Sequence, residues 1–101
     1  MDKILQYIGI SIKSRNIVMG TDTVIMNLQK NNLHLIILST DSSVSLKDKI
    51  TKKAFHYSVK VIEKYDGATL SKITNKDVLV LGIIDKGISD AIIQLEENKE
   101  E

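Results

Sequence analysis

Two short and continuously apolar segments constrain the fold of this chain more than any other feature of its sequence. They are residues 34–38 (HLIIL) and 78–84 (VLVLGII). Both are too short for a buried helix and consist mainly of branched aliphatic side chains, which is typical of strands covered on both faces. The second segment is the strongest strand signal in the chain, so we expect it in the centre of a sheet.

Segments with the periodicity of amphipathic helices alternate with these strands. Their apolar side chains recur three and four residues apart, which places them on one face of a helix. The segments with this pattern are residues 3–14, 21–30, 44–57, 66–73 and the stretch that follows Asp85. Two weaker strands are expected at residues 17–19 and 59–62. The alternation predicts an α/β protein, a three-layer α/β/α sandwich with a small mixed sheet.

Polar residues mark the ends of the predicted elements. Asn31 and Asn32 follow the second helix, and asparagine tolerates the left-handed conformation that ends a helix. The acidic residues beside predicted turns and helix starts are Asp41, Asp66, Asp77 and Asp85. Capping of free helix amides explains each of these carboxylates without catalysis.

Charge divides the chain into a body and a tail. A chain of 101 residues has room for one core, so we expect residues 1–95 to form a single domain. Residues 96–101 (EENKEE) carry four acids and one base and are expected to form a solvated acidic tail. The body then carries 13 bases and 9 acids. This mild excess of positive charge fits an ordinary surface as well as a binding face.

The sequence offers little support for catalysis or for a metal or cofactor site. It has no cysteine, which excludes disulfides and cysteine-ligated zinc. His34 and His56 each lack a second histidine at ligand spacing, and the chain has neither a phosphate-loop lysine motif nor a GxGxxG run. It also shows no leader-like start and no apolar run of the ~20 residues that span a bilayer. We therefore expect a cytoplasmic protein that is not an enzyme, carries no cofactor or metal and does not enter a membrane.

The start of the second predicted helix is the most informative candidate for a binding site. Gly20 permits unusual backbone dihedrals or a close approach, and Thr21, Asp22 and Thr23 form the first helical turn. Free amides at a helix start attract phosphate, and short polar side chains can bond base edges. A plain helix cap is the simpler interpretation of the same residues.

Three further groups of polar residues could extend such a site. The outward face of the same helix is predicted to carry Thr23, Met26, Asn27 and Lys30. A polar and basic cluster precedes the strongest strand and consists of Lys72, Thr74, Asn75 and Lys76. The helix over residues 44–57 carries a basic side formed by Lys47, Lys49, Lys52, Lys53 and His56. A solvated face is the simpler interpretation of lysines opposite an apolar stripe.

The order and spacing of several motifs resemble a known family. The motifs are residues 8–9 (IG), 13–20 (KSRNIVMG), 35–41 (LIILSTD), 52–57 (KKAFHY), 70–76 (LSKITNK) and 78–87 (VLVLGIIDKG). Over residues 5–92 the chain resembles the bacterial YlxQ-type ribosomal-protein-like family. That family is a branch of the kink-turn RNA binders, which include archaeal ribosomal protein L-seven-Ae.

The resemblance implies a fold and an RNA-binding surface. The fold is a three-layer α/β/α sandwich, and the surface combines the start of the second helix with neighbouring loops. The strong kink-turn binders have Asn, Glu and Lys where this chain has Asp22, Thr23 and Met26. Arg15 and Asn16 replace a Gly-Lys pair of the closer bacterial relatives, and Arg15 restores positive charge. The expected RNA-binding residues are Arg15, Gly20, Thr21, Asp22, Thr23, Met26, Asn27, Lys30, Lys72, Thr74, Asn75 and Lys76.

Three functions remain open at this point. The leading hypothesis is a non-enzymatic binder of structured, kink-turn-type RNA that is linked to the ribosome or to translation. The alternative is a protein-interaction adaptor that kept the fold and lost RNA binding. The outward position of Met26 and the negative charge of Asp22 support this alternative. A third hypothesis places a small ligand or a reaction at Asp41 and Asp85, which both follow apolar strands.

Overall fold

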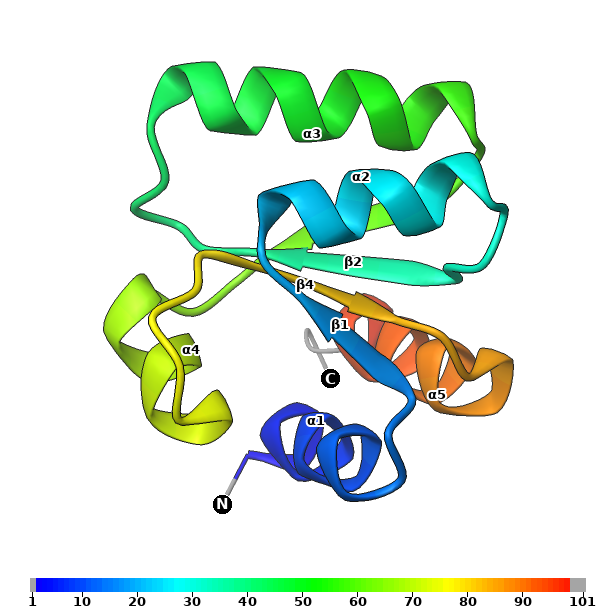
Figure 1. The fold of residues 1–101 in the computed structure, drawn as a ribbon. Helices are drawn as coiled ribbons and strands as arrows, with labels where there is room; N and C mark the ends of the chain where they lie inside the picture. The colour runs from blue at the N-terminus through cyan, green and yellow to red at the C-terminus, as the bar shows by residue number, and fades with distance from the viewer. Residues whose placement is uncertain (1, 99–101) are drawn as a thin grey trace.

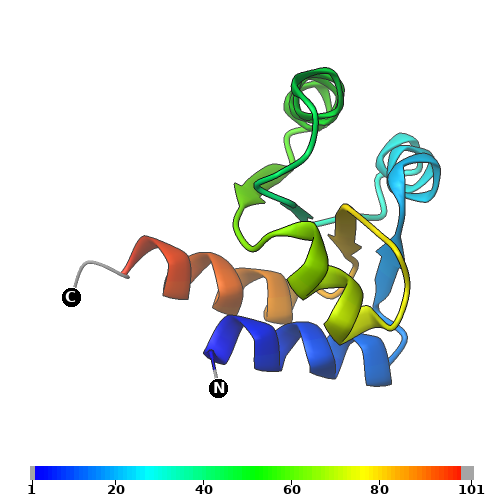
Figure 2. The same cartoon turned by 90° about the vertical axis from the view of Figure 1, so that its left-hand side faces the viewer.

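The computed structural model describes residues 2–98 and has the expected three-layer α/β/α architecture (Figure 1). The sheet forms the middle layer, with α2 and α3 on one face and α1, α4 and α5 on the other (Figure 2). The elements in chain order are α1 (Lys3–Lys13), β1 (Ile17–Met19), α2 (Thr21–Gln29), β2 (Leu35–Leu38), α3 (Val44–His56), β3 (Lys60–Glu63), α4 (Gly67–Thr74), β4 (Val80–Ile83) and α5 (Lys86–Glu97). No helix within residues 2–98 combines the length and the apolar character needed to cross a membrane.

The sheet is mixed, with strand order β1-β4-β2-β3. β4 pairs antiparallel with both β1 and β2, whereas β2 and β3 run parallel. The strand expected in the centre therefore lies there. The register places Leu38 opposite Val80 and Leu35 opposite Ile83. We call the first of these ends the Gly20 end, because the Gly20 N–H donates to the Val80 carbonyl there (3.0 Å). We call the other the Arg15 end, because the adjoining Asn16 carbonyl accepts from the Ile84 N–H (2.8 Å).

Side chains of the central strands alternate between two separate apolar cores. Leu35 and Ile37 point to the face covered by α1, α4 and α5, whereas Ile36 and Leu38 point to α2 and α3. The first core also contains Ile4, Ile8, Ile62, Leu70, Val78, Leu81, Ile83 and Ile92. The second also contains Val24, Leu28, Leu33, Ile50, Ala54 and Val80. Burial on both faces explains why the central strands have no polar alternation in the sequence.

The predicted helix ends agree with the observed caps except at Asp77, which is exposed and caps none of the helices within residues 2–98. Asn31 has φ +56° and Asn75 has φ +60°, so asparagines end α2 and α4 in the left-handed region. Asp85 accepts a hydrogen bond from the Ile88 N–H at 2.8 Å and begins α5. Asp66 caps α4 by accepting a hydrogen bond from the Thr69 N–H (2.9 Å). Hydrogen bonds from the side chain and the backbone of Thr69 lower the pKa of the Asp66 carboxyl.

The strand predicted over residues 78–84 is longer than the observed β4. Val78 and Leu79 lie in the loop that precedes it, because the pairing of β4 with β2 ends at Leu38 opposite Val80. The Leu79 carbonyl instead accepts from the Ser39 N–H (2.8 Å), and the Leu79 side chain is 39% exposed. An apolar side chain is therefore displayed at the Gly20 end.

The end of α5 differs from the expected tail. α5 continues to Glu97, so the helix does not stop at residue 95. The Glu96 carboxylate lies 3.3 Å from the Lys64 ammonium, and Glu97 lies 3.8 Å from that of Lys60. Glu96 and Glu97 thus pair with lysines on β3 and directly after it, and these pairs favour the continuation of α5 to Glu97. Residues 99–101 of the expected tail lie outside the described residues.

Gly82 lets the core beside α2 close against the sheet. A Cβ at this position would lie 2.7 Å from Leu33 Cδ1 and 3.0 Å from Val18 Cγ2. Both neighbours are apolar side chains that pack in the second core. At position 82, therefore, β4 has no room for a side chain on this face.

We expect Gly82→Ala to lower the free energy of unfolding by about 1–3 kcal/mol, since an added methyl overpacks the site. Gly9→Ala is the matched control, because nothing lies within 4 Å of a Cβ at Gly9 in α1. That variant should be as stable as the parent or up to about 1 kcal/mol more stable. Urea unfolding measures both. A fully stable Gly82→Ala protein would contradict this account of the packing.

Candidate functional site

The backbone conformation of Gly20 determines how α2 begins. Gly20 has φ +94° and ψ 154°, a region that is accessible essentially only to glycine. This conformation turns the chain from β1 into α2 while the Gly20 N–H still bonds to β4. The Gly20 carbonyl accepts the first bond of the helix from the Val24 N–H (2.9 Å).

The first turn of α2 leaves backbone donors available. No side chain caps the helix, because its N-cap residue is Gly20. The amides of Thr21, Asp22 and Thr23 precede the first helical bond and therefore have no partner within the helix. Asp22 and Thr23 are exposed. Such a turn offers N–H donors and short polar side chains to an anion or to polar base edges.

Two loops border this turn. The loop of residues 75–79 ends beside Gly20, since Gly20 and Val80 are bonded. The loop of residues 39–43 lies next to it, because Ser39 bonds to Leu79. Neighbouring strands lie about 4.8 Å apart, so Gly20, Ser39 and residues 79–80 form one continuous surface at the Gly20 end. The exposed residues of the two loops include Thr40, Asp41, Asn75, Lys76, Asp77 and Leu79.

Asp41 ties this surface to α4. Its Oδ1 accepts a hydrogen bond from the Gly67 N–H (2.9 Å), so it caps a helix that begins 26 residues later. The sequence predicted a capping role for Asp41, and the structure identifies the long-range partner. The Gly67 position is crowded, since a Cβ there would meet Leu79 Cδ2 at 2.8 Å. Asp41, Gly67 and Leu79 therefore pack as a unit.

The outward face of α2 is as predicted at three positions. Thr23, Met26 and Lys30 are exposed, and Met26 retains 49% of its accessible surface. Asn27 differs, because it is half-buried and its side chain is used locally. Its Nδ2 donates to the Thr23 carbonyl and its Oδ1 accepts from Asn32, both at 2.9 Å.

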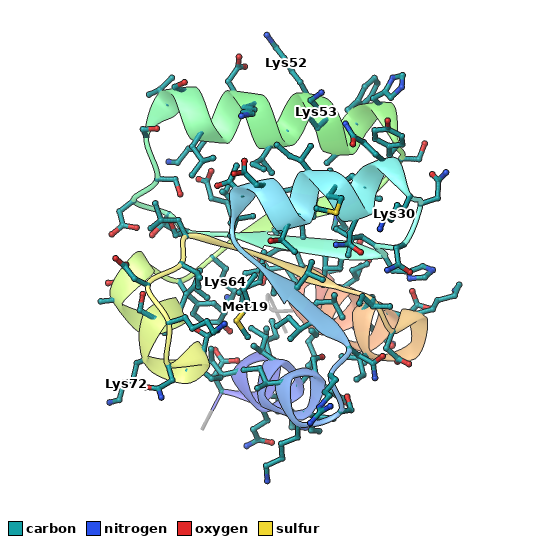
Figure 3. All side chains as sticks on the ribbon, in the orientation of Figure 1. Met19, Lys30, Lys52, Lys53, Lys64 and Lys72 are labelled. Carbon is teal, nitrogen blue, oxygen red and sulfur yellow. The ribbon has the colours of Figure 1, made fainter. Side chains whose placement is uncertain are left out.

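Several of the expected RNA-binding residues lie away from the start of α2. Arg15 lies at the opposite end of the sheet, next to the Asn16–Ile84 hydrogen bond. Lys30 lies at the far end of α2, and Lys72 extends outward from α4, well away from the start of α2 (Figure 3). Asn75 is the exposed C-cap of α4.

Thr74 has a structural role in the turn after α4. Its side chain is 7% exposed, and its hydroxyl donates to the Leu70 carbonyl (2.8 Å). The same oxygen accepts from the Lys76 N–H (3.3 Å). These bonds close the end of α4 and leave the hydroxyl facing the protein. Of this residue pair, Lys76 rather than Thr74 is exposed, and it lies in the turn after α4.

The hypothesis of a site shared by Asp41 and Asp85 does not agree with the sheet. β2 and β4 are antiparallel, so the residues that follow them emerge at opposite ends. Asp41 lies at the Gly20 end and Asp85 at the Arg15 end, and each carboxylate caps a different helix. Among residues 2–98, no group of three potential metal-binding side chains is present.

We expect Asp41→Ala to lower the free energy of unfolding by about 1–3 kcal/mol, because the buried Gly67 N–H loses its acceptor. Asp77→Ala removes an exposed acid from the neighbouring loop and serves as the control, with an expected change within about 0.5 kcal/mol. Urea unfolding of both variants measures the difference. Equal stabilities would show that the bond between Asp41 and Gly67 contributes nothing.

Comparison with known proteins covers nearly the whole domain. The model of the ribosomal protein L7Ae/L30e/S12e/Gadd45 family matches residues 2–93. RNA-binding protein YlxQ of Bacillus subtilis (strain 168) is 27% identical over 89 residues, which cover 87% of this chain and 89% of that protein. RNA-binding protein YlxQ of Enterococcus faecium is 23% identical over 87 residues, covering 86% and 84% respectively.

Solved structures show the same architecture. A protein of unknown function from Bacillus halodurans superposes with a TM-score of 0.92 at 25% identity, covering 97% of this chain and all of its own. The 15.5kD RNA binding protein of Giardia lamblia superposes with a TM-score of 0.81 over 96% of this chain and 90% of its own. Its identity is 13%, so the likeness concerns the fold.

Proposed function

Because this chain belongs to the ribosomal protein L7Ae/L30e/S12e/Gadd45 family, we propose that it binds structured RNA without catalysing a reaction. Two similar proteins that align over most of its length are RNA-binding proteins by name, which supports RNA as the partner. We further propose that the RNA contains a kink-turn and that the protein acts in the cytoplasm, in association with the ribosome or with translation.

The open first turn of α2 is the observation that carries this proposal. Its amides have no intrahelical partner and no side-chain cap, and Thr23 stands exposed beside them. Fixed donors of this kind bond phosphate oxygens and the polar edges of splayed bases without an ordering cost. The exposed Leu79 beside this turn adds an apolar contact, and Lys76, in the turn after α4, adds positive charge on the approach to it. We assign Gly20, Thr21, Asp22, Thr23, Met26 and Lys76 to the RNA surface.

The resemblance to strong kink-turn binders suggests that this surface binds more weakly. Met26 replaces a lysine, which removes one phosphate contact, and Asp22 adds a negative charge near the expected phosphates. The Asp22 carboxylate is nevertheless favourable for the free protein, since negative charge is stabilised beside free helix amides. An RNA phosphate must therefore compete with the Asp22 carboxylate for the positive amino end of α2.

A protein-interaction adaptor is the second candidate, and the half-exposed Met26 favours it. A flexible apolar side chain on an outward helix face is suited to a protein partner. Capture of a defined protein that survives nuclease treatment supports this function, whereas loss of the captured material on nuclease treatment supports RNA binding.

A titration with labelled RNA tests the proposed function. One RNA contains a standard kink-turn, and the other is a matched duplex without the kink, each at two salt concentrations. We expect tighter binding to the kinked RNA and a fall in affinity as salt rises. Equal and weak binding to both RNAs, abolished by salt, would contradict the proposal and leave the adaptor function.

We expect Thr23→Glu combined with Met26→Lys to bind kink-turn RNA about tenfold more tightly than the parent, since a phosphate contact is added. Ile10→Lys is the control for the added lysine. Ile10 is 50% exposed, almost the same as Met26, but lies on α1 across the sheet. That variant should change the affinities for kinked and straight RNA equally and slightly. Unchanged or weaker binding by the double variant would disprove the assigned geometry.

A further inference from the structure

A basic hollow on the second half of α3 lies outside the surface assigned above. It has a volume of about 450 Å³ and is lined by Lys49, Lys52, Lys53, His56 and Tyr57. Residues three and four apart on a helix share a face, so the four basic side chains project from one side of α3. The His56 and Tyr57 rings meet edge to face, with centroids 4.7 Å apart, and form one wall.

In the described part of the chain, few carboxylates lie near the lysines that line this hollow. The Lys52 ammonium lies 3.0 Å from the Asp48 carboxylate, in a pair whose side chains are both exposed. Within residues 2–98, no carboxylate is in ion-pair contact with Lys49 or Lys53. Like charges four residues apart, such as Lys49 and Lys53, destabilise a helix. A bound anion would relieve this repulsion.

An exposed aromatic side chain adjoins the basic group. Phe55 retains 86% of its accessible surface, whereas the core side of α3 is formed by Ile50 and Ala54. It lies three residues after Lys52, so the two side chains are neighbours on the helix surface. Lysines beside an exposed ring suit unpaired nucleotides, since bases stack on the ring while the lysines neutralise phosphates. A continuous duplex keeps its bases stacked and offers none to the ring.

We propose that the second half of α3 is a second RNA contact, which takes an unpaired strand adjoining the structured element bound at α2. In this contact Phe55 stacks on a base, and Lys49, Lys53 and His56 hold the phosphates. The inference rests on the proposed RNA binding and extends it to a second class of RNA structure, single-stranded RNA.

The arrangement of the helices lets one RNA reach both contacts. α2 and α3 lie beside each other, and both begin at the Gly20 end (Figure 1). α3 spans 13 residues, so its last turn lies roughly 20 Å from its start. Lys52 and Lys53 extend outward from α3, and Lys30 stands at the end of α2 in the same half of the molecule (Figure 3). A strand that leaves the start of α2 can therefore follow the helices to the hollow.

The test compares a kink-turn RNA with the same RNA carrying an extension of about ten unpaired nucleotides. The free extension is titrated separately. We expect the extension to tighten binding by the full-length protein about tenfold and to steepen its salt dependence. Lys49→Gln with Lys53→Gln should abolish this gain and reduce the salt slope by about one to two. Phe55→Ala should reduce the gain about fivefold or more.

Lys3→Gln with Lys13→Gln is the charge-matched control, because both lysines are exposed on α1 across the sheet. That variant should keep the full gain from the extension. Far-ultraviolet circular dichroism and urea unfolding establish that each variant is folded. Val44→Ala, at another highly exposed apolar position on α3, controls for Phe55→Ala.

The outcomes separate this inference from the proposed function. If the kinked RNA binds but its extension adds no affinity, or if the α3 variants match the control, the second contact is disproved and the first stands. If the free extension binds in a manner that requires Lys49, Lys53 and Phe55 but the kink adds nothing, the second contact stands and kink recognition fails. If neither RNA binds, both are overturned.

Discussion

The antiparallel insertion of β4 between β1 and β2 determines most of what else the structure can do. It buries a strand on both faces, which requires two separate cores and therefore helices on both sides of the sheet. It also decides which loops meet. Gly20 is bonded to the first residue of β4, and the loop after β2 is bonded to the residue before it. The binding surface assigned to α2 is thus assembled from segments that are brought together by one strand.

Local features of the fold could be predicted from the sequence because local chemistry determines them. Helical periodicity, the uninterrupted apolar strands and capping by Asn31, Asp66 and Asp85 all depend on residues close in the chain. Gly20 and the polar turn after it were likewise identified, since a glycine with positive φ before a helix is a local feature.

Features that depend on long-range pairing could not be predicted in this way. Leu79 has the sequence context of a buried strand residue, and its exposure follows from the end of the pairing between β2 and β4 at Val80. Arg15 is only five residues from Gly20 in the sequence, but β1 lies between them and runs from one end of the sheet to the other. The bond from Asp41 to α4 spans 26 residues, and the burial of Thr74 depends on the turn that follows it. These placements required the strand order, which periodicity does not specify.

The proposed RNA surface and the proposed second contact differ in their chemistry. The start of α2 presents backbone donors, short polar side chains and an apolar neighbour, with one acidic residue among them. The hollow on α3 presents lysines and an exposed ring. The first suits a rigid and specific RNA shape, whereas the second suits an irregular strand of variable sequence. Under these two proposals, a protein with a formal net charge of only +1 separates recognition from charge neutralisation.

Three helices begin at the Gly20 end of the sheet, and this has an electrostatic consequence. α2 begins beside Val80, and α3 and α4 follow the parallel strands β2 and β3, so the amino ends of all three helices gather there. Each helix macrodipole places about half a positive charge at its amino end. The carboxylates of Asp41 and Asp66 cap α4 and offset its share of this charge, so the uncapped start of α2 is where the backbone charge stays open to an anion. Because it comes from the peptide groups, this partial charge remains when exposed side chains such as Asp22 and Met26 are exchanged.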